Sequence, residues 1–189
     1  MKHRQTPSQT VGPFFGPALI QTGGDNLVVE DTRGERVSIE GRIIDGDGAP
    51  VTDAMVEIWQ ANAEGKYDHL DDDQEKLLDP HFHGYGRAAT DSHGAFRFHT
   101  IKPGAIPGID GALQAPHINV SIFARGLLKR LVTRIYFPGE QLNTTDAVLN
   151  STPRERRATI IGEWTDATHR ALRFEIILQG ANETVFLDI

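Results

Sequence analysis

Apolar and polar residues alternate in several short segments of the chain, beginning near residue 36. In RVSIEGRIID (36–45), Val37, Ile39 and Ile43 fall at even spacing. Successive side chains of a strand point to opposite faces, so these three share one side of an extended chain. A Gly-rich turn, GDGAPV, follows before AMVEIWQA (54–61). The other predicted strands are GRAAT (86–90), AFRFHT (95–100), HINVSIF (117–123), RLVTRIYF (130–137), ALRFEIIL (171–178) and TVFLDI (184–189).

Turn-forming residues separate these segments, as in TDSHG, KPGAIPGIDG and QGANE. About eight short strands separated by such turns predict an all-β fold, a β-sandwich, over residues 31–189. Residues 1–30 are rich in Pro, Gly, Thr and Gln and lack periodicity, which predicts an extended N-terminal arm. We expect the arm to pack on a partner chain; an unordered terminus is the alternative.

One short helix is predicted in STPRERRATIIG (151–162). Thr152 can act as N-cap, Pro153 suits the first helical position, and Glu155 stands three residues after the cap. This is the capping-box arrangement, in which two side chains satisfy free backbone N–H groups. The segment lies outside the strand pattern.

Composition narrows the possible functions. The 189 residues, 39% hydrophobic and 24% charged, suit one ordinary globular domain with a substantial core. A net charge of −7 with 19 scattered Lys and Arg argues against a nucleic-acid binder. No cysteine is present, which excludes disulfides and thiol chemistry. Neither a signal peptide nor a membrane span is recognisable, so we expect a cytoplasmic protein.

The candidate chemistry rests on histidines, since no nucleophile elbow or phosphate-binding Gly motif occurs. Two pairs stand at metal-ligand spacing among the eight His residues: His81 with His83, and His117 with Asn119. The first pair lies in a predicted loop and is also typical of a surface His cluster. His117 is equally compatible with a buried His that is hydrogen-bonded to the backbone.

A longer segment carries a family resemblance. IEGRIIDGDGAPVTDAMVEIWQANAEGKY (39–67) resembles the signature of the intradiol ring-cleavage dioxygenases, with Gly41, Gly48, Glu57, Gly65 and Tyr67 at the family spacing. The later segments GRAATD, TIKPG, PHI and TRIYF extend the similarity over residues 5–189. The resemblance implies a β-sandwich and chemistry at a non-haem Fe(III) held by two Tyr and two His. Anionic phenolate oxygens suit this hard cation.

Only two of the family's four iron ligands are present in this sequence. The resemblance places the first Tyr at Tyr67 and the first His at His117, but the second Tyr at Ile106 and the second His at Asn119. An Ile side chain cannot ligate, and an amide is a neutral donor poorly matched to ferric iron. We therefore expect no metal and no catalytic residue in this chain. Tyr67 and His117 would keep structural roles, hydrogen-bonded to each other.

Three neighbouring positions depart from the family pattern as well. Gln114 stands where the family has an Arg, Arg134 where it has a Gln, and Gly108 where it has a Trp of the substrate pocket.

Together these departures resemble the iron-free subunits of heteromeric family members. The resemblance then implies a homologous iron-bearing beta subunit as partner, Fe(III) in that partner, and cleavage of protocatechuate by dioxygen to 3-carboxy-cis,cis-muconate. It places Arg125, Gly12 and Pro13 of this chain at the partner's substrate pocket. A guanidinium can bind the substrate carboxylate, while Gly and Pro supply close approach and shape. Taken without the resemblance, the three are ordinary turn residues.

Two other functions stay open at this point. The first is a self-sufficient dioxygenase that uses Tyr67 and His117 with His81 or His83 as borrowed ligands. The second is a β-sandwich binding module without enzymatic activity, because this fold serves many functions.

Overall fold

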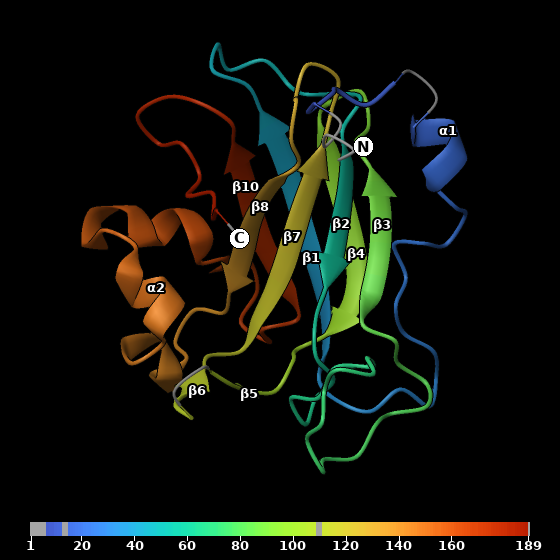
Figure 1. The fold of residues 1–189 in the computed structure, drawn as a ribbon, viewed down its shortest axis with the longest axis vertical. Coiled ribbons are helices and arrows are strands. Elements are labelled where there is room, and N and C mark those ends of the chain that lie inside the picture. Colours follow the sequence, from blue (N-terminus) through green and yellow to red (C-terminus); the bar gives the residue numbers. More distant parts are fainter. Residues whose placement is uncertain (1–6, 13–14, 109–110, 189) are drawn as a thin grey trace, which may run out of the picture.

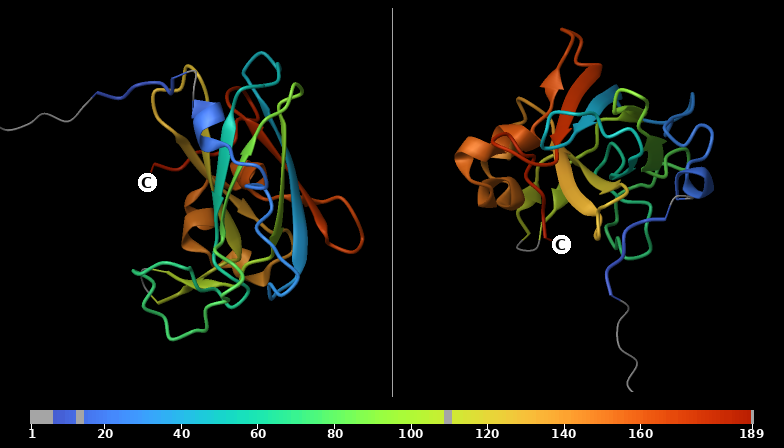
Figure 2. Two further views of the ribbon diagram at one scale, coloured as in Figure 1. Left: turned by 90° about the vertical axis from the view of Figure 1, so that its right-hand side faces the viewer. Right: turned by 90° about the horizontal axis from the view of Figure 1, so that it is seen from above.

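Two four-stranded sheets pack face to face in the computed structural model, which describes residues 7–12, 15–108 and 111–188 (Figures 1 and 2). The first sheet has the order β4-β1-β10-β9, with β1 and β10 parallel. The second has the order β3-β2-β7-β8, with antiparallel neighbours. The strands are β1 (Arg36–Ile44), β2 (Met55–Trp59), β3 (Tyr85–Ala89), β4 (Ala95–Ile101), β7 (His117–Phe123), β8 (Leu131–Tyr136), β9 (Glu163–Trp164) and β10 (Ala171–Ile177). A separate hairpin pairs β5 (Ile106–Pro107) with β6 (Leu113–Gln114).

The core lies between the sheets and follows the alternation in the sequence. Val37, Ile39 and Ile43 are at most 3% exposed, as the pattern of β1 predicts. Burial of such a side chain stabilises the fold by roughly 1.5–3 kcal/mol relative to leaving it exposed. Within the same strand, a Cβ at Gly41 would lie 2.2 Å from the Phe96 ring, so only glycine lets this ring pack over β1. The predicted β-sandwich is confirmed.

The C-terminal segment differs from its prediction. TVFLDI forms no strand within the described residues, although it runs beside both sheets: the Thr184 N–H donates to the Ile177 carbonyl (2.9 Å) and the Leu187 N–H to the Val132 carbonyl (2.7 Å). Single bonds to two different strands do not make a ladder. The eighth strand of the sandwich is instead the short β9.

The prediction of a helix at 151–162 capped by Thr152 is wrong in the type of helix and in the capping residue. Residues Arg154–Ile160 form a 3₁₀ helix, and Thr152 makes no capping bond. The α-helix of this region, α2, precedes it at Ala147–Ser151 and is capped by Asp146, whose carboxylate accepts from the Leu149 N–H. A further 3₁₀ turn spans Gln141–Thr144. No helix of the described residues is long and apolar enough to cross a bilayer.

The arm is not extended throughout. Residues Phe15–Leu19 form the short helix α1, and a turn follows at 21–24. Beyond this turn the Leu27 N–H donates to the His99 carbonyl (2.8 Å) and the His99 N–H to the Asp25 carbonyl (2.8 Å), so the end of the arm pairs with the free edge of β4. Because backbone bonds at a strand edge need no particular side chain, the sequence pattern gave no sign of this pairing.

Candidate functional site

The former ligand positions lie on the outer face of the second sheet. Ile118, Val120 and Ile122 of β7 point into the core, so His117 and Asn119 point outward. The two 3₁₀ helices, α2 and the β5–β6 hairpin cover one end of this face, as Figure 1 shows at lower left. The middle of the face is open.

Tyr67 reaches this face from the loop that follows β2. Gly65 makes the approach possible: it has φ +78°, and a Cβ there would lie 2.0 Å from the Ala105 carbonyl oxygen. The Tyr67 N–H donates to the Asp72 carboxylate (2.8 Å), and its ring packs on Trp59 with centroids 4.5 Å apart. The loop thus fixes the Tyr67 hydroxyl over the sheet.

Asn119, and not His117, is the partner of Tyr67. The Asn119 Nδ2 donates to the Tyr67 hydroxyl (3.0 Å), and its Oδ1 accepts from the Arg134 Nε (3.1 Å). The expected bond between Tyr67 and His117 does not form. Both ends of the Asn119 amide are engaged, which fixes its orientation.

Arg134 continues this network into the covered end. Its Nη1 donates to the Gln114 Oε1 (2.8 Å) and to the Tyr136 hydroxyl (3.2 Å). The Tyr136 hydroxyl in turn donates to Oδ1 of Asp146 (3.0 Å). Asp146 is fully buried and also accepts from the Ala115 N–H (2.8 Å), besides capping α2. One chain of hydrogen bonds therefore runs from Tyr67 to α2.

His117 is 3% exposed and stands beside this network. Its Nδ1 bonds with the Ala115 carbonyl (2.8 Å), so that nitrogen carries the proton. Its Nε2 is buried without a hydrogen-bond partner among the described residues. Burial, aided by the nearby charge of Arg134, lowers the pKa of His117 to about 4. The imidazole is neutral at pH 7.

Ferric iron does not fit these residues. Burial raises the pKa of Tyr67, only partly offset by the Asn119 bond and the Arg134 charge, which opposes formation of the anionic ligand that Fe(III) prefers. Ile106 has no donor atom. The Asn119 amide is occupied, and one of its partners is the cationic guanidinium of Arg134. A second cation beside it would be repelled.

The other His pair offers no substitute. His81 and His83 are exposed, and the His83 Nδ1 bonds with Asp68 (2.6 Å). Within the ranges that the structure describes, no three His, Cys, Asp or Glu side chains are grouped as metal ligands. The surface interpretation of this pair is the one that the geometry favours.

Arg125 lies at the opposite end of β7, in a group that we call the Arg125 corner: Thr10, Asp53, Arg125 and Gly126. The Arg125 Nε pairs with the Asp53 carboxylate, and its side chain is 68% exposed. The Gly126 N–H donates to the Thr10 hydroxyl (2.8 Å), which holds the arm against the turn after β7. Gly12 lies two residues further along the arm and is exposed. Pro13 lies outside the described residues.

The arm also borders Arg125 on its other side. Arg125 shares a cavity of about 220 Å³ with Phe15, Gly16 and Pro17 of the arm and with Asp53. Two segments more than a hundred residues apart in the sequence therefore meet at one corner.

Sequence reasoning missed two residues with central positions. Asp53 could have been noticed only as a charge in a turn, because nothing local ties it to Arg125. Asp146 directly precedes α2 and is a residue type that caps helices. The capping pattern at Thr152 is stronger, so the helix was predicted in the segment after it.

Comparisons with known proteins agree with this geometry. The dioxygenase family model matches residues 11–180. The chain is 40% identical to a protocatechuate 3,4-dioxygenase alpha chain of Burkholderia cepacia, over 98% of both chains. It is 41% identical to the beta chain from the same organism, over 80% of this chain and 67% of that one.

A solved structure shares the fold. The dioxygenase domain of a carbohydrate-binding fusion protein from Streptomyces sp. SirexAA-E superposes with a TM-score of 0.66 and 30% identity, covering 94% of this chain and all of that one. The two-sheet architecture, the matched family model and the relatives along its whole length lead to one conclusion: this chain belongs to the intradiol ring-cleavage dioxygenase family.

Proposed function

We propose that this chain is the iron-free alpha subunit of a heteromeric protocatechuate 3,4-dioxygenase. The observation that carries the proposal is the state of the former ligand positions. Ile106 and Asn119 cannot complete a ferric site, and a guanidinium is bonded to Asn119. The similarity to an alpha chain across the full length of both proteins supports the same assignment.

The iron-bearing partner is proposed to be a homologous beta subunit. A beta chain is among the relatives of this chain, as expected if the two subunit types diverged from one ancestor. Fe(III) in the partner would supply the activation by which dioxygen breaks the bond between the two hydroxyl-bearing carbons, with both oxygen atoms going to the product. This chain would contribute to binding and leave the redox chemistry to the partner.

Arg125 is the residue that we expect to contact the substrate. Its guanidinium is exposed, and an exposed ion pair with Asp53 contributes little in water, so Arg125 can turn to a ligand. A carboxylate such as that of protocatechuate would accept a charge-assisted hydrogen bond from it. Gly12 and Pro13 would form the rest of this wall, held by the contact between Thr10 and Gly126.

Co-expression with neighbouring reading frames tests the assembly. The expected result is a stable complex with a homologous chain, with one iron per pair of chains and cleavage of protocatechuate. The chain purified alone and supplied with ferrous or ferric salt should show neither stoichiometric iron nor tyrosinate-to-iron colour. Iron and ring cleavage in the isolated chain would overturn the proposal and favour the self-sufficient dioxygenase.

A further inference from the structure

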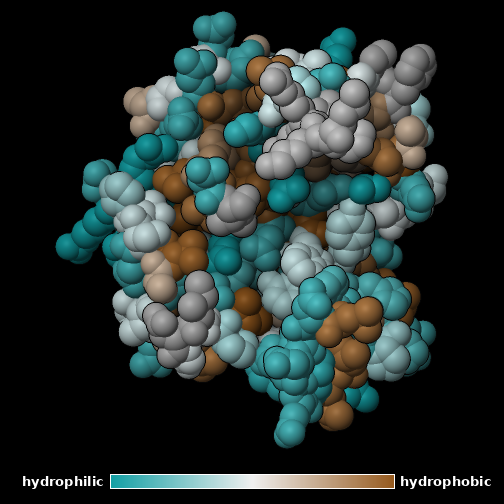
Figure 3. All heavy atoms as spheres, in the orientation of Figure 1, coloured by the Kyte–Doolittle hydropathy of each residue, from teal (hydrophilic) through white to brown (hydrophobic). Residues whose placement is uncertain are grey.

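A second hollow lies on the outer face of the second sheet, away from the Arg125 corner. It has a volume of about 590 Å³, within the range of small-molecule sites. Figure 3 shows this face, hollowed near its centre where hydrophilic residues gather. We call it the open cleft; it is lined by Glu57, Ile58, Trp59, Tyr67, His69, Tyr85, Asn119, Ser121, Arg130, Val132 and Arg134. From Asn119 to Arg125 the rise of β7 alone separates the two regions by roughly 20 Å.

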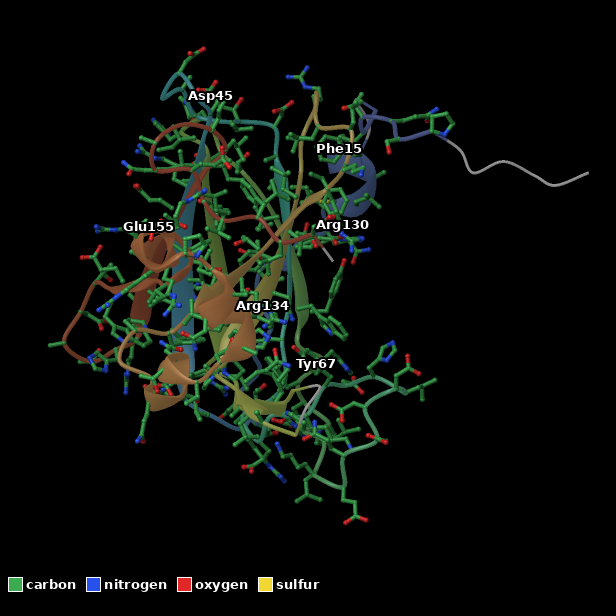
Figure 4. The ribbon with its side chains drawn as sticks, turned by 60° about the vertical axis from the view of Figure 1, so that its left-hand side comes forward. Phe15, Asp45, Tyr67, Arg130, Arg134 and Glu155 are labelled. Atoms are coloured by element: carbon green, nitrogen blue, oxygen red, sulfur yellow. The ribbon has the colours of Figure 1, made fainter. Side chains whose placement is uncertain are left out.

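Two arginines enter the cleft without a carboxylate partner. Arg130 directly precedes β8 and Arg134 lies within it, and both line the cleft together with Tyr67; Figure 4 labels the three residues. Neither has a carboxylate within 4.0 Å in the part of the chain that the structure describes. In a chain with a net charge of −7, two such cations in one hollow are unexpected for a surface without a ligand.

The one carboxylate of the cleft is already engaged. Glu57 accepts from the Arg87 Nε (2.6 Å) and from the Tyr85 hydroxyl (2.8 Å). It is therefore held at the β3 side of the cleft. Among the described residues, no carboxylate within 4.0 Å balances the positive charge of Arg130 and Arg134.

The remaining polar groups at this end of the cleft are chiefly donors. Among the described residues the Nη2 of Arg134 has no acceptor, since its bonds to Asn119, Gln114 and Tyr136 use Nε and Nη1. The Tyr67 hydroxyl accepts from Asn119, so its own hydrogen is free to be donated. A ligand that offers only acceptors, such as a carboxylate, complements this set.

Aromatic rings form the opposite wall. Trp59 and Tyr85 are 39% and 46% exposed, although rings of this size are usually more buried. They are neighbours across β2 and β3, and Trp59 also packs on Tyr67 and His69. A flat apolar ligand body could lie against Trp59 while its anionic end meets the arginines.

We propose that the open cleft is a binding site for a small aromatic carboxylate, with Arg130, Arg134 and Tyr67 binding the carboxylate and Trp59 packing on the ring. The site belongs to this chain alone and needs no metal. It goes beyond the proposed subunit function, because it does not depend on the partner's iron or on Arg125.

The test uses the intact chain and 4-fluorobenzoate, followed by ¹⁹F NMR line broadening and calorimetry. We expect saturable binding with a dissociation constant on the order of 1 mM or below, as befits a ligand of this size. Arg130→Gln should weaken binding by about tenfold through loss of one charge-assisted contact. The matched control is Lys129→Gln, which removes a positive charge from the neighbouring exposed residue outside the cleft. Its affinity should stay within about twofold of the wild type, because an exposed surface charge is screened by salt.

Three further measurements make the result decisive. Trp59→Leu should weaken 4-fluorobenzoate more than it weakens 4-fluorocyclohexanecarboxylate, because only the flat ring gains from stacking. Inorganic phosphate at equal concentration should compete poorly. Arg134→Gln should also weaken binding, with circular dichroism to verify its fold.

Several outcomes would overturn the proposal. These are the absence of saturable binding up to tens of millimolar, equal losses in Arg130→Gln and Lys129→Gln, and binding abolished by Arg125→Gln but unaffected by Arg130→Gln. Each leaves the subunit assignment untouched, since that assignment is decided by co-purification and iron content.

Discussion

The two ends of β7 differ in how their polar side chains are bonded: those near His117 form a hydrogen-bond network within the chain, whereas Arg125 at the other end is mostly exposed. At the His117 end, Asn119, Arg134, Tyr136 and Asp146 bond to one another; Tyr136 and Asp146 are fully buried, Asn119 and Arg134 partly buried. At the Arg125 end, a single exposed ion pair and one backbone contact hold the turn. Burial raises the cost of an unpaired group, so Tyr136 and Asp146 at the first end should govern stability, whereas Arg125 at the second end should govern binding at the partner's pocket.

The largest effect is expected for Asp146→Ala. The substitution leaves the Tyr136 hydroxyl and the N–H groups of Ala115 and Leu149 without an acceptor. Loss of several buried bonds at one residue should lower the free energy of unfolding by about 3–5 kcal/mol. Urea denaturation measures it, with Asp146→Asn as a control that keeps the shape and one oxygen. A loss below 1 kcal/mol would show that the network is not structural.

The next effect is a pH dependence at His117. Its pKa is about 4 in the folded chain and near 6.5 when unfolded, so the unfolded state binds more protons between these values. Stability is therefore full above pH 6.5 and falls as the pH drops toward 4. Between pH 7.5 and 4.5 the wild type should lose about 2–3 kcal/mol more than His117→Gln.

Urea denaturation at both pH values, wild type against variant, isolates this contribution from those of other groups. His93→Gln, at an exposed position, serves as the control and should follow the wild type. If His117→Gln also followed the wild type, His117 would not be a buried neutral imidazole.

Arg125→Ala should act on binding rather than on folding. In the assembled enzyme we expect KM for protocatechuate to rise about tenfold, the low end of a hydrogen bond to a charged group, with iron content unchanged. The free energy of unfolding of the chain should change by less than about 1 kcal/mol, because the ion pair is exposed. Steady-state kinetics and denaturation of the same variant decide the point. An unchanged KM would remove Arg125 from the proposed pocket wall.

The smallest effect is expected for Asp53→Asn. The exposed pair with Arg125 is worth about 0–1 kcal/mol, so unfolding should hardly change. In the assembled enzyme KM should shift by no more than about threefold, well below the effect of Arg125→Ala. A loss as large as that of Arg125→Ala would mean that Asp53 orients the guanidinium for binding.

The sequence predicted what depends on local pattern. The alternation of Val37, Ile39 and Ile43 predicted β1 and its buried face correctly, because a strand with one buried face carries an apolar residue at nearly every second position. The replaced ligands at Ile106 and Asn119 were likewise readable position by position.

What the sequence did not reveal depends on contacts between distant segments. The pairing of Arg125 with Asp53 and of Gly126 with Thr10 has no local signature. Nor did the sequence show that Arg134, noted only as a departure from the family pattern, joins Asn119 to Tyr136 by hydrogen bonds. The bond between Arg134 and Asn119 follows from the register of β7 against β8, which sets the two residues opposite each other and cannot be derived from the sequence alone.

The parallel pairing of β1 with β10 has a consequence for the order of folding. All four strands of the second sheet are complete once Tyr136 has been synthesised, whereas β1 gains its second neighbour only when β10 follows. At ribosomal speeds of about 5–20 residues per second, the nascent chain would spend several seconds with β1 paired on one edge alone. The sheet that carries both the open cleft and the Arg125 corner can thus form first, and the late arrival of β10 would seal its apolar face.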